Sequence, residues 1–374
     1  MHLFFGIGAL LDPFFGRELA CGLGYRLLLK ASQPDRIRRY TEGFPRSCDS
    51  RGYTGQTTMN LRSGCKAAFT LIEVVVVLSI LLIIAAITIP AVMRARESAR
   101  QAQCLSNLKS IAIAINSHLD QKNYYPREEN LYSPFVSMLP FLDQTPLFNS
   151  FILTSHRQFA HGPSDVNYTA YSTKVSVFVC PSDTVSFAPL GPCTYGGNLG
   201  TGVGRWLRPD NGPFASSLID PKIRDALVRD GLANTVAVSE FCRTSGRSTP
   251  RSPHAVFQLE APYEKSQFDS MISDCYTVNV NQQPMNLSFR GFCWAFDSTF
   301  NTLYDHNITP NHPACACASG SLSGAWTASS NHPGGVNCAH LDGHVSFIHD
   351  DVSISTWRAL GTIAGGEIFS VSPD

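Results

Sequence analysis

Residues 69–89 read FTLIEVVVVLSILLIIAAITI, and this run decides how the rest of the chain is arranged. Its 21 residues carry one charge, that of Glu73. About 20 apolar residues in a helix span the roughly 30 Å hydrocarbon core of a bilayer. A cleaved signal peptide has a shorter apolar core, typically about 7–15 residues. The run therefore predicts a transmembrane helix, with an ordinary signal-anchor or a buried core helix as the alternatives.

Glu73 is the costly residue of this span. A carboxylate inside the apolar layer costs roughly 2.5–3.5 kcal/mol on insertion scales, and less near the interface. Cleavage just before Phe69 would create a free α-amino group that could pair with Glu73, on the same chain or on a neighbouring copy. Between copies, this charge pair would help to set their register.

An amphipathic pattern follows Pro90. Apolar residues recur at steps of three and four, which predicts a helix that continues from the span. Pro90 should kink this helix without separating its halves. We expect one helix over residues 69–118, transmembrane over 69–89 and amphipathic over 91–118, roughly 75 Å long at 1.5 Å per residue. The repeating apolar positions are Ala95, Ala99, Ala102, Leu105, Leu108, Ala112, Ile115 and Leu119.

The sequence Ala68-Phe69-Thr70-Leu71-Ile72-Glu73, after basic Arg62 and Lys66, resembles the cleavage and methylation motif of type IV pilins and type II pseudopilins. The resemblance implies that a prepilin peptidase cuts between Ala68 and Phe69, that Phe69 is N-methylated, and that Glu73 serves subunit assembly. Pro90 is the 22nd residue counted from Phe69, where pilin helices commonly carry a proline. The family usually has Gly before the cut, whereas this chain has Ala68.

Residues 1–68 hold 10 Lys/Arg and 5 Asp/Glu, and residues 69–374 hold 19 and 24, so the two parts carry +5 and −5. A mildly acidic body lacks the clustered basic surface that nucleic-acid binding needs, so no nucleic-acid partner is predicted. Basic residues flank the span on both sides, so the positive-inside rule does not decide orientation. The pilin resemblance implies a single-pass protein of the cytoplasmic (inner) membrane, with its head outside the cytoplasm.

Residues 59–68 (MNLRSGCKAA) form a short basic leader of the pilin type. Residues 1–58 hold two apolar pieces that are too short to span a membrane and are broken by charges. We expect translation to start at Met59, with 1–58 an over-long gene prediction. A genuine extended leader is the alternative.

Nine cysteines follow the span: Cys104, Cys180, Cys193, Cys242, Cys275, Cys293, Cys315, Cys317 and Cys338. No CxxC pair occurs, and no Cys/His set has zinc-finger spacing. Disulfides persist outside the cytoplasm, so the cysteines indicate an oxidising compartment. Because nine is odd, at least one thiol stays free or pairs between chains. Cys104 and Cys180 are a candidate helix-to-head disulfide, whereas Cys315 and Cys317 stand too close for an easy mutual one.

Residues 119–374 should form the head, in which Gly, Pro, Asn and Ser punctuate short apolar runs. Residues 173–180, 235–239 and 336–340 are predicted strands, and residues 133–148 hold at least one helical turn. Asp342-Gly343 between two alternating runs predicts a β-hairpin, because both residues tolerate positive φ. The fold class is α+β: a long N-terminal helix packed on a mainly antiparallel β head.

Several head segments resemble a family of prepilin-like proteins known as DUF1559. They are residues 104–109 (CLSNLK), 139–144 (LPFLDQ), 180–183 (CPSD), 230–235 (DGLANT) and 357–361 (WRALG), together with a His332-x9-Asp342-Gly343 element. The resemblance covers roughly residues 60–374. It implies architecture and location, without an established activity.

His340, Asp342 and His344 alternate, with His332 nearby, which is a pattern that could bind a metal. The Asp342-Gly343 turn interrupts the alternation, so turn chemistry for Asp342 and a hydrogen bond from His332 that fixes the Pro-Gly-Gly loop are the preferred interpretations. No GxSxG, SxxK or HExxH motif occurs. Gly200-Thr-Gly-Val-Gly204 lacks the spacing of a nucleotide loop and is predicted to be a surface loop. No enzyme activity, metal or cofactor is predicted.

The predicted function is that of a pseudopilin-type structural subunit that self-associates, or meets other pilin-like subunits, through its N-terminal helix. A second hypothesis is a tethered extracytoplasmic head that binds a ligand without forming filaments. Its four tryptophans permit this without arguing for it: Trp206, Trp294, Trp326 and Trp357. A third is a metal hydrolase built on His332 and its neighbours.

Overall fold

The computed structural model describes residues 69–128, 132–153, 165–183, 185, 190–202, 211–214, 222–244, 254–259, 263, 267–281, 290–296, 301–317 and 324–366. The chain divides into two units, Met1–Ala68 and Phe69–Asp374. The expected leader (59–68) and the segment before it (1–58) lie outside the described residues, as does Trp206.

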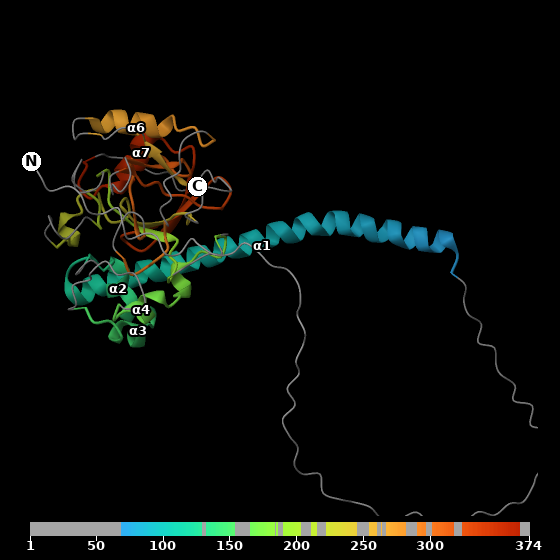
Figure 1. Cartoon of the computed structure of the whole chain (residues 1–374), viewed down its shortest axis with the longest axis horizontal. Coiled ribbons are helices and arrows are strands. Elements are labelled where there is room, and N and C mark those ends of the chain that lie inside the picture. Colours follow the sequence, from blue (N-terminus) through green and yellow to red (C-terminus); the bar gives the residue numbers. More distant parts are fainter. Residues whose placement is uncertain are drawn as a thin grey trace, which may run out of the picture. The chain divides into compact units, whose positions relative to one another are not determined.

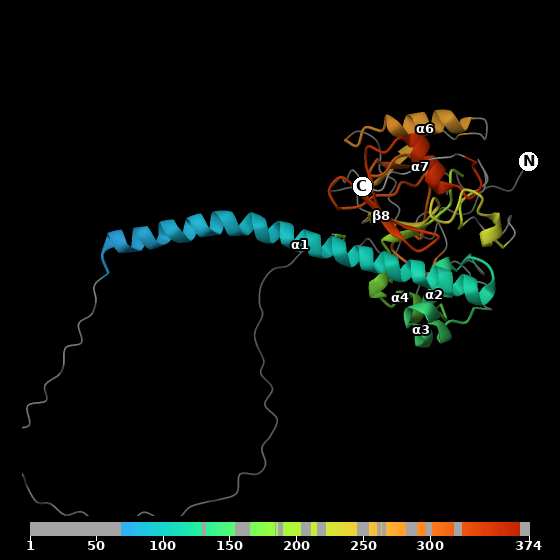
Figure 2. The same cartoon turned by 180° about the vertical axis from the view of Figure 1, so that it is seen from behind.

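One helix, α1 (Leu71–Lys122), runs without interruption through Pro90 (Figures 1 and 2). The Thr70 side chain caps its first turn, and Asn123 ends it in the left-handed region at φ 63°. Asn tolerates this conformation better than most residues, which makes it a suitable helix stop. The prediction of a single helix that contains Pro90 is confirmed, and the helix ends four residues beyond the expected 118.

The two halves of α1 have opposite surroundings. In the anchor half (residues 71–93), the large apolar side chains are exposed by 45 to 83%. This half is long and apolar enough to cross a membrane. In the docked half (residues 97–122), one side of the helix is buried against the head. Its buried residues are Cys104, Asn107, Leu108, Ile111, Ala112, Ala114, Ile115 and His118.

The head is organised around a five-stranded sheet in the order β4-β1-β2-β7-β8. All its neighbouring strands pair antiparallel except β1 and β4. A second sheet has the order β3-β5-β6, with β3 and β5 parallel. The strands are β1 (Tyr195–Asn198), β2 (Val236–Glu240), β3 (Val256–Leu259), β4 (Leu303–Tyr304), β5 (Ala314–Cys317), β6 (Gly324–Ala325), β7 (Gly335–His340) and β8 (Val345–His349). The fold is therefore α+β, as predicted.

Helices cover both faces of the five-stranded sheet. Ala339 and Leu341 belong to the core that includes the docked half of α1. Val336 and Cys338 belong to a separate core around Trp357 of α7 (Ile354–Gly361). Successive residues of a strand point to opposite faces, so β7 supplies side chains to both cores. This explains why every residue of β2 and β7 is buried.

The predicted strand at 173–180 is wrong, because this segment holds the short 3-10 helix η2 (Ser176–Phe178). Val175 and Phe178 are both buried, and their three-residue spacing matches a 3-10 helix, in which positions i and i+3 lie on one side. The other short helices are α2 (Pro134–Met138), η1 (Leu139–Leu142), α3 (Thr145–Asn149), α4 (Tyr168–Ser172), η3 (Asp225–Leu227) and α6 (Phe268–Tyr276). Those from 134 to 149 all begin within the segment 133–148 that was expected to contain helical turns, and α3 ends one residue beyond it.

The predicted hairpin is confirmed by β7 and β8, which pair from Gly335 with His349 to Ala339 with Val345. Its turn differs from the expected one. The backbone N–H of Gly343 donates to the carbonyl of His340 at 2.9 Å. Only Gly343, at φ 90°, is left-handed. The hairpin thus turns at Leu341 and Asp342 and then needs a glycine bulge, so positive φ is required at one residue and not at both.

Candidate functional site

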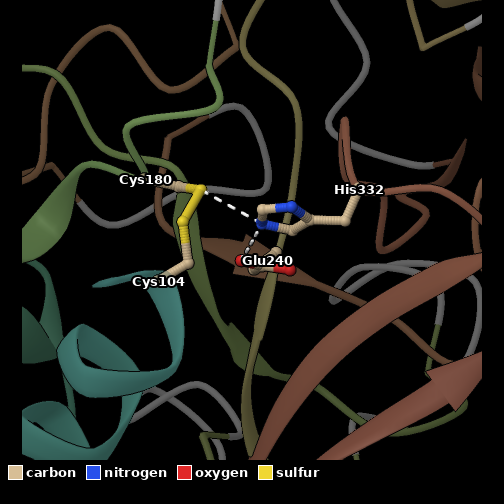
Figure 3. A group of neighbouring side chains, drawn as sticks. All are labelled: Cys104, Cys180, Glu240 and His332. Atoms are coloured by element: carbon tan, nitrogen blue, oxygen red, sulfur yellow. Dashed lines mark hydrogen bonds and ion pairs between the residues drawn. A yellow bond between two sulfur atoms is a disulfide. The ribbon is translucent and has the colours of Figure 1, made fainter. Parts of the chain in front are cut away.

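Four side chains from distant parts of the sequence meet between α1 and the head (Figure 3). Cys104 comes from α1, Cys180 follows η2, Glu240 ends β2, and His332 precedes β7. All four residues are buried. We refer to Cys104, Cys180, Glu240 and His332 as the junction site.

Cys104 and Cys180 form a disulfide, with their Cα atoms 5.1 Å apart. They are the two cysteines that sequence analysis identified as a candidate helix-to-head disulfide. The bond joins the docked half of α1 directly to the head, across 76 positions of the sequence. The helix is therefore tied covalently to the domain that it carries.

The segment Cys180-Pro-Ser-Asp183 is a tight turn that serves this junction. The backbone N–H of Asp183 donates to the carbonyl of Cys180 at 3.0 Å. The turn directs the Ser182 hydroxyl toward α1, where it donates to Glu97 Oε1 at 2.8 Å. The Asp183 carboxylate accepts a hydrogen bond from the Arg243 guanidinium. Each end of the turn is thus held by a different part of the protein.

The His332 ring lies between two carboxylates, and its side chain is fully buried. Nδ1 is 2.9 Å from Glu97 Oε1 on α1. Nε2 is 3.4 Å from Glu240 Oε1 on β2 and 3.5 Å from Cys180 Sγ. Burial by itself lowers the pKa of His332, but the neighbouring carboxylates of Glu240 and Glu97 outweigh it, so the pKa is raised. The imidazole consequently links the helix to the central sheet.

Glu240 is the carboxylate of the junction site, and its side chain is only 2% exposed, against 30% for Glu97. Its Oε2 accepts hydrogen bonds from the backbone N–H and the side-chain amide of Asn337, at 2.9 and 3.0 Å. Among the described residues, none donates a hydrogen bond to its Oε1. This oxygen faces His332 instead.

A second contact fastens α1 near the other end of the His332-x9-Asp342-Gly343 element. The Lys109 ammonium donates to the carbonyl of Gly343 at 2.7 Å. Glu97 and Lys109 are twelve positions apart on α1, or roughly 18 Å along the helix axis. The two ends of the element thus hold α1 at two separate points.

In place of the expected hydrogen bond to the Pro-Gly-Gly loop, the His332 ring contacts Glu97 and Glu240.

His340, Asp342 and His344 lie at the hairpin end. The rings of His340 and His344 stack with centroids 3.9 Å apart. His344 Nδ1 is 2.6 Å from Asp342 Oδ1, which also accepts from the His344 backbone N–H at 3.0 Å. Asp342 therefore stabilises the turn in this structure, and His332 lies in the junction site rather than in this group.

The processing and assembly residues lie at the start of α1. Phe69 is 75% exposed, and Ala68 lies outside the described residues. Glu73 completes a capping box: its Oε2 accepts from the Thr70 backbone N–H and hydroxyl, both at 2.8 Å. The carboxylate that the sequence marked as needing a partner thus finds one within its own first turn.

Other residues noted in the sequence belong to the core. Cys315 forms a disulfide with Cys275 of α6, while Cys317 stays a buried thiol. Gly200, Thr201 and Gly202 are buried, so the predicted surface loop is wrong over these residues.

Three further thiols and three tryptophans are also part of the core. Desolvation is the main cause that raises the pKa of these buried thiols to about 12, which keeps them protonated: Cys193, Cys242 and Cys338. Three tryptophans are fully buried and line no surface: Trp294, Trp326 and Trp357.

The sequence did not single out Glu97, Glu240 or Lys109 as site residues. Glu97 carried one usable signal, since it is an acidic residue among Arg94, Arg96 and Arg100 directly after the span. Glu240 directly follows the strand predicted at 235–239, and nothing in the sequence marked it as a buried site residue. Its burial becomes visible only once β2 and β7 are paired.

Two family profiles match this chain. Residues 93–354, more than half of the chain, match the family described as "Protein of unknown function (DUF1559)". The chain belongs to the DUF1559 family. Residues 64–89 of this DUF1559 protein match the prokaryotic N-terminal methylation motif, which implies a prepilin-type protein processed by a peptidase. Both resemblances seen in the sequence are thereby confirmed, and neither profile describes an enzyme. No curated protein and no solved structure matches.

Proposed function

We propose that this DUF1559 protein is a pseudopilin-type structural subunit of the cytoplasmic membrane. A prepilin peptidase cuts between Ala68 and Phe69, Phe69 is N-methylated, and the head stands outside the cytoplasm. The observation that carries this proposal is the division of α1, whose anchor half is exposed while its docked half is buried and cross-linked to the head. The methylation motif, which ends at residue 89, supports it.

The anchor half needs an apolar environment, which the lipid bilayer and neighbouring copies of the same helix both provide. Burying its side chains gains roughly 25 cal/mol per Å² of apolar surface. Glu73 lies within this half, and its capping hydrogen bonds occupy Oε2. Oε1 therefore remains able to accept a hydrogen bond from a methylated α-amino group of a neighbouring copy. In this arrangement Glu73 caps its own helix and pairs with the next subunit.

Glu73→Ala separates processing from assembly. The expected result is a chain that is still cut before Phe69 but no longer yields the cross-linked multimers that the unaltered protein gives in its native membranes. Asp120→Ala, which removes an exposed acid from the other end of α1, is the matched control and should leave the multimers intact. Multimers that persist in Glu73→Ala would contradict the assembly role.

A tethered, ligand-binding head is the second candidate, and one cavity favours it. The cavity measures about 350 Å³ and lies between the last turn of α1 and the helices α2, η1 and α3. This volume is within the range of small-molecule sites. Four of its lining residues are aromatic: Tyr124, Tyr132, Phe141 and Phe148. The charged side chains of its lining are Lys122 and Arg127, so the cavity suits an anion with an apolar or aromatic part.

Anilinonaphthalene sulfonate, an anionic aromatic dye, tests this second candidate on the whole protein in detergent. Binding in the cavity should enhance its fluorescence, and Arg127→Gln should weaken the binding several-fold without altering the folded state. Equal binding by Arg127→Gln and the unaltered protein would place the dye elsewhere and remove the support that the cavity gives. The absence of multimers in native membranes, together with specific binding, would favour this function over assembly.

A further inference from the structure

The junction site holds more potential metal ligands than a mechanical link between helix and head requires. One ligand atom from each of Cys104, Cys180, Glu240 and His332 lies within 4.8 Å of every other (Figure 3). Two sulfurs, one imidazole nitrogen and one carboxylate oxygen form a donor set that suits a zinc ion. In the described state the two sulfurs are bonded to each other and are therefore not available as thiolate ligands.

The His332 ring is oriented as in metal sites. Its Nδ1 is held by Glu97 at 2.9 Å, and Nε2 points into the site. Histidines that bind metals almost always donate their other ring N–H to a carboxylate, carbonyl or water, which fixes the tautomer. If Nδ1–H donates to Glu97, Nε2 meets an acceptor oxygen of Glu240 at 3.4 Å. The approach of Nε2 to the Glu240 oxygen is favourable only if Nε2 carries a proton or binds a metal ion.

Glu240 supplies a second, independent observation. Its Oε1 is buried and receives no hydrogen bond from any described residue, while Oε2 is held by Asn337. A buried carboxylate oxygen normally has hydrogen-bond partners, so an exception calls for an explanation. Here the oxygen points toward His332 Nε2, as Figure 3 shows. An ion at that place would satisfy it.

The distances around Nε2 fit a tetrahedral ion. Zinc bonds of about 2.0 Å to nitrogen or oxygen and 2.3 Å to sulfur place neighbouring ligands roughly 3.3–3.8 Å apart. Nε2 lies 3.4 Å from Glu240 Oε1 and 3.5 Å from Cys180 Sγ. A hollow of about 10 Å³ adjoins the site on the side of Cys180 and Glu240, and is not lined by Cys104 or His332. That is about the space that a single water-sized particle occupies.

We propose that reduction of the Cys104–Cys180 disulfide converts the junction site into a zinc site with ligands Cys104, Cys180, His332 and Glu240. The protein would then exchange one link between α1 and the head for another. The disulfide holds the junction under oxidising conditions, and the metal holds it when the cysteines are reduced. This inference concerns the junction alone and does not depend on whether the anchor half assembles.

The chemistry balances with a thiol as the reductant. Two thiols deliver two electrons and two protons to the disulfide, the S–S bond breaks, and the products are one new disulfide and the thiols of Cys104 and Cys180. Zinc then displaces the proton of each thiol and any proton on His332 Nε2, so binding releases two or three protons. With two thiolates and the carboxylate of Glu240, the ligands bring three negative charges to the Zn²⁺ ion. Glu97 remains outside the first coordination sphere and orients the imidazole.

The test compares the oxidised and reduced states of the whole processed protein in detergent. One sample is reduced with a water-soluble phosphine, and both are then titrated with Zn²⁺ in metal-free, oxygen-free buffer. Bound zinc is counted by mass spectrometry of the element. We expect one more equivalent in the reduced protein than in the oxidised protein. Co²⁺ in place of zinc should give thiolate-to-metal charge-transfer absorption, which requires sulfur ligands.

Variants assign that extra equivalent to this site. Cys104→Ser, Cys180→Ser and His332→Gln should each abolish it, whereas the double variant Cys275→Ser/Cys315→Ser, which removes the other described disulfide, should retain it. Glu97→Gln keeps all four ligands and should weaken zinc binding about 10–100-fold, as expected of a positioning residue. Near-ultraviolet circular dichroism of each oxidised variant identifies those that have lost the native fold.

The proposal fails if the reduced protein binds no additional zinc. It fails equally if the additional zinc persists in Cys104→Ser and Cys180→Ser, because the ion would then lie at other thiols. Glu97→Gln keeps the test decisive should the cysteine variants misfold, since a folded Glu97→Gln protein with unchanged zinc affinity would overturn the geometry proposed around His332.

Discussion

The two halves of α1 belong to one continuous helix but follow different rules. The anchor half has large apolar side chains on all sides, and they are exposed. The docked half has a buried side that starts at Cys104, while Ile113 on the same stretch is 53% exposed. A helix that is apolar all round suits a membrane, whereas an apolar stripe suits packing on a domain. The pattern of side chains, rather than the helix itself, therefore decides what each half contacts.

The two family profiles meet near the boundary between the anchor half and the docked half of α1. The methylation motif ends at residue 89, and the DUF1559 match begins at residue 93. Pro90 stands between them, inside α1. One helix thus joins an export and anchoring segment to a head that fastens onto it by the disulfide, by His332 and by Lys109. Changes in the two halves should therefore affect different properties of the protein.

The largest expected effect on the docked half comes from its covalent link. Replacing Cys104 and Cys180 together by Ser should lower the free energy of unfolding of the head by about 4 kcal/mol, because the bond closes a long loop of 76 positions. Hydrogen exchange should rise along residues 97–122. The control double variant, Cys275→Ser/Cys315→Ser, should leave exchange in that part of α1 unchanged. Equal protection of the docked half with and without the Cys104–Cys180 bond would contradict the account.

A matched pair of leucines compares the two halves directly. Leu108 is fully buried in the docked half and Leu82 is 70% exposed in the anchor half. Leu108→Ala leaves a cavity and should lower the free energy of unfolding of the head by about 3 kcal/mol. Leu82→Ala should leave it unchanged within about 0.5 kcal/mol. Thermal or denaturant unfolding in detergent measures both, and similar losses in the two variants would mean that the halves are not independent.

The smallest effect concerns the contact between Lys109 and Gly343. Lys109→Met keeps most of the side-chain length but removes the hydrogen bond to the turn carbonyl, and should lower the free energy of unfolding by about 1 kcal/mol. Lys122→Met, in the exposed last turn of α1, is the control and should change it by less than about 0.5 kcal/mol. Urea unfolding in detergent gives both values. A loss no larger than that of the control would show that this second point does not stabilise the docked helix.

Sequence reasoning succeeded where local pattern determines structure. Four features each depend on a short stretch with its own periodicity or turn signal. They are the anchor run, the amphipathic continuation past Pro90, β2 and the β7–β8 hairpin. It failed at residues 173–180, where alternating Val and Phe suggested a strand. Among the described residues no strand pairs with this segment, and burial of Val175 and Phe178 favours a 3-10 turn.

The junction site was only partly accessible to such reasoning. The DUF1559 resemblance drew attention to Cys104, Cys180 and His332, but not to the carboxylates that His332 contacts. Glu97 and His332 are 235 positions apart, and nothing local in either segment identifies the other. The pairing follows from the docking of α1 beside β2 and β7, which is a property of the whole fold.

The identity of the N-terminus in native membranes tests the central claim most directly, because anchoring, processing and orientation all depend on it. Mass spectrometry of the intact protein should find a chain that begins at Phe69 and carries one methyl group on its α-amino nitrogen. A chain that retains residues before Phe69, or that is cut at another position, would contradict the prepilin account and leave α1 as an ordinary membrane anchor.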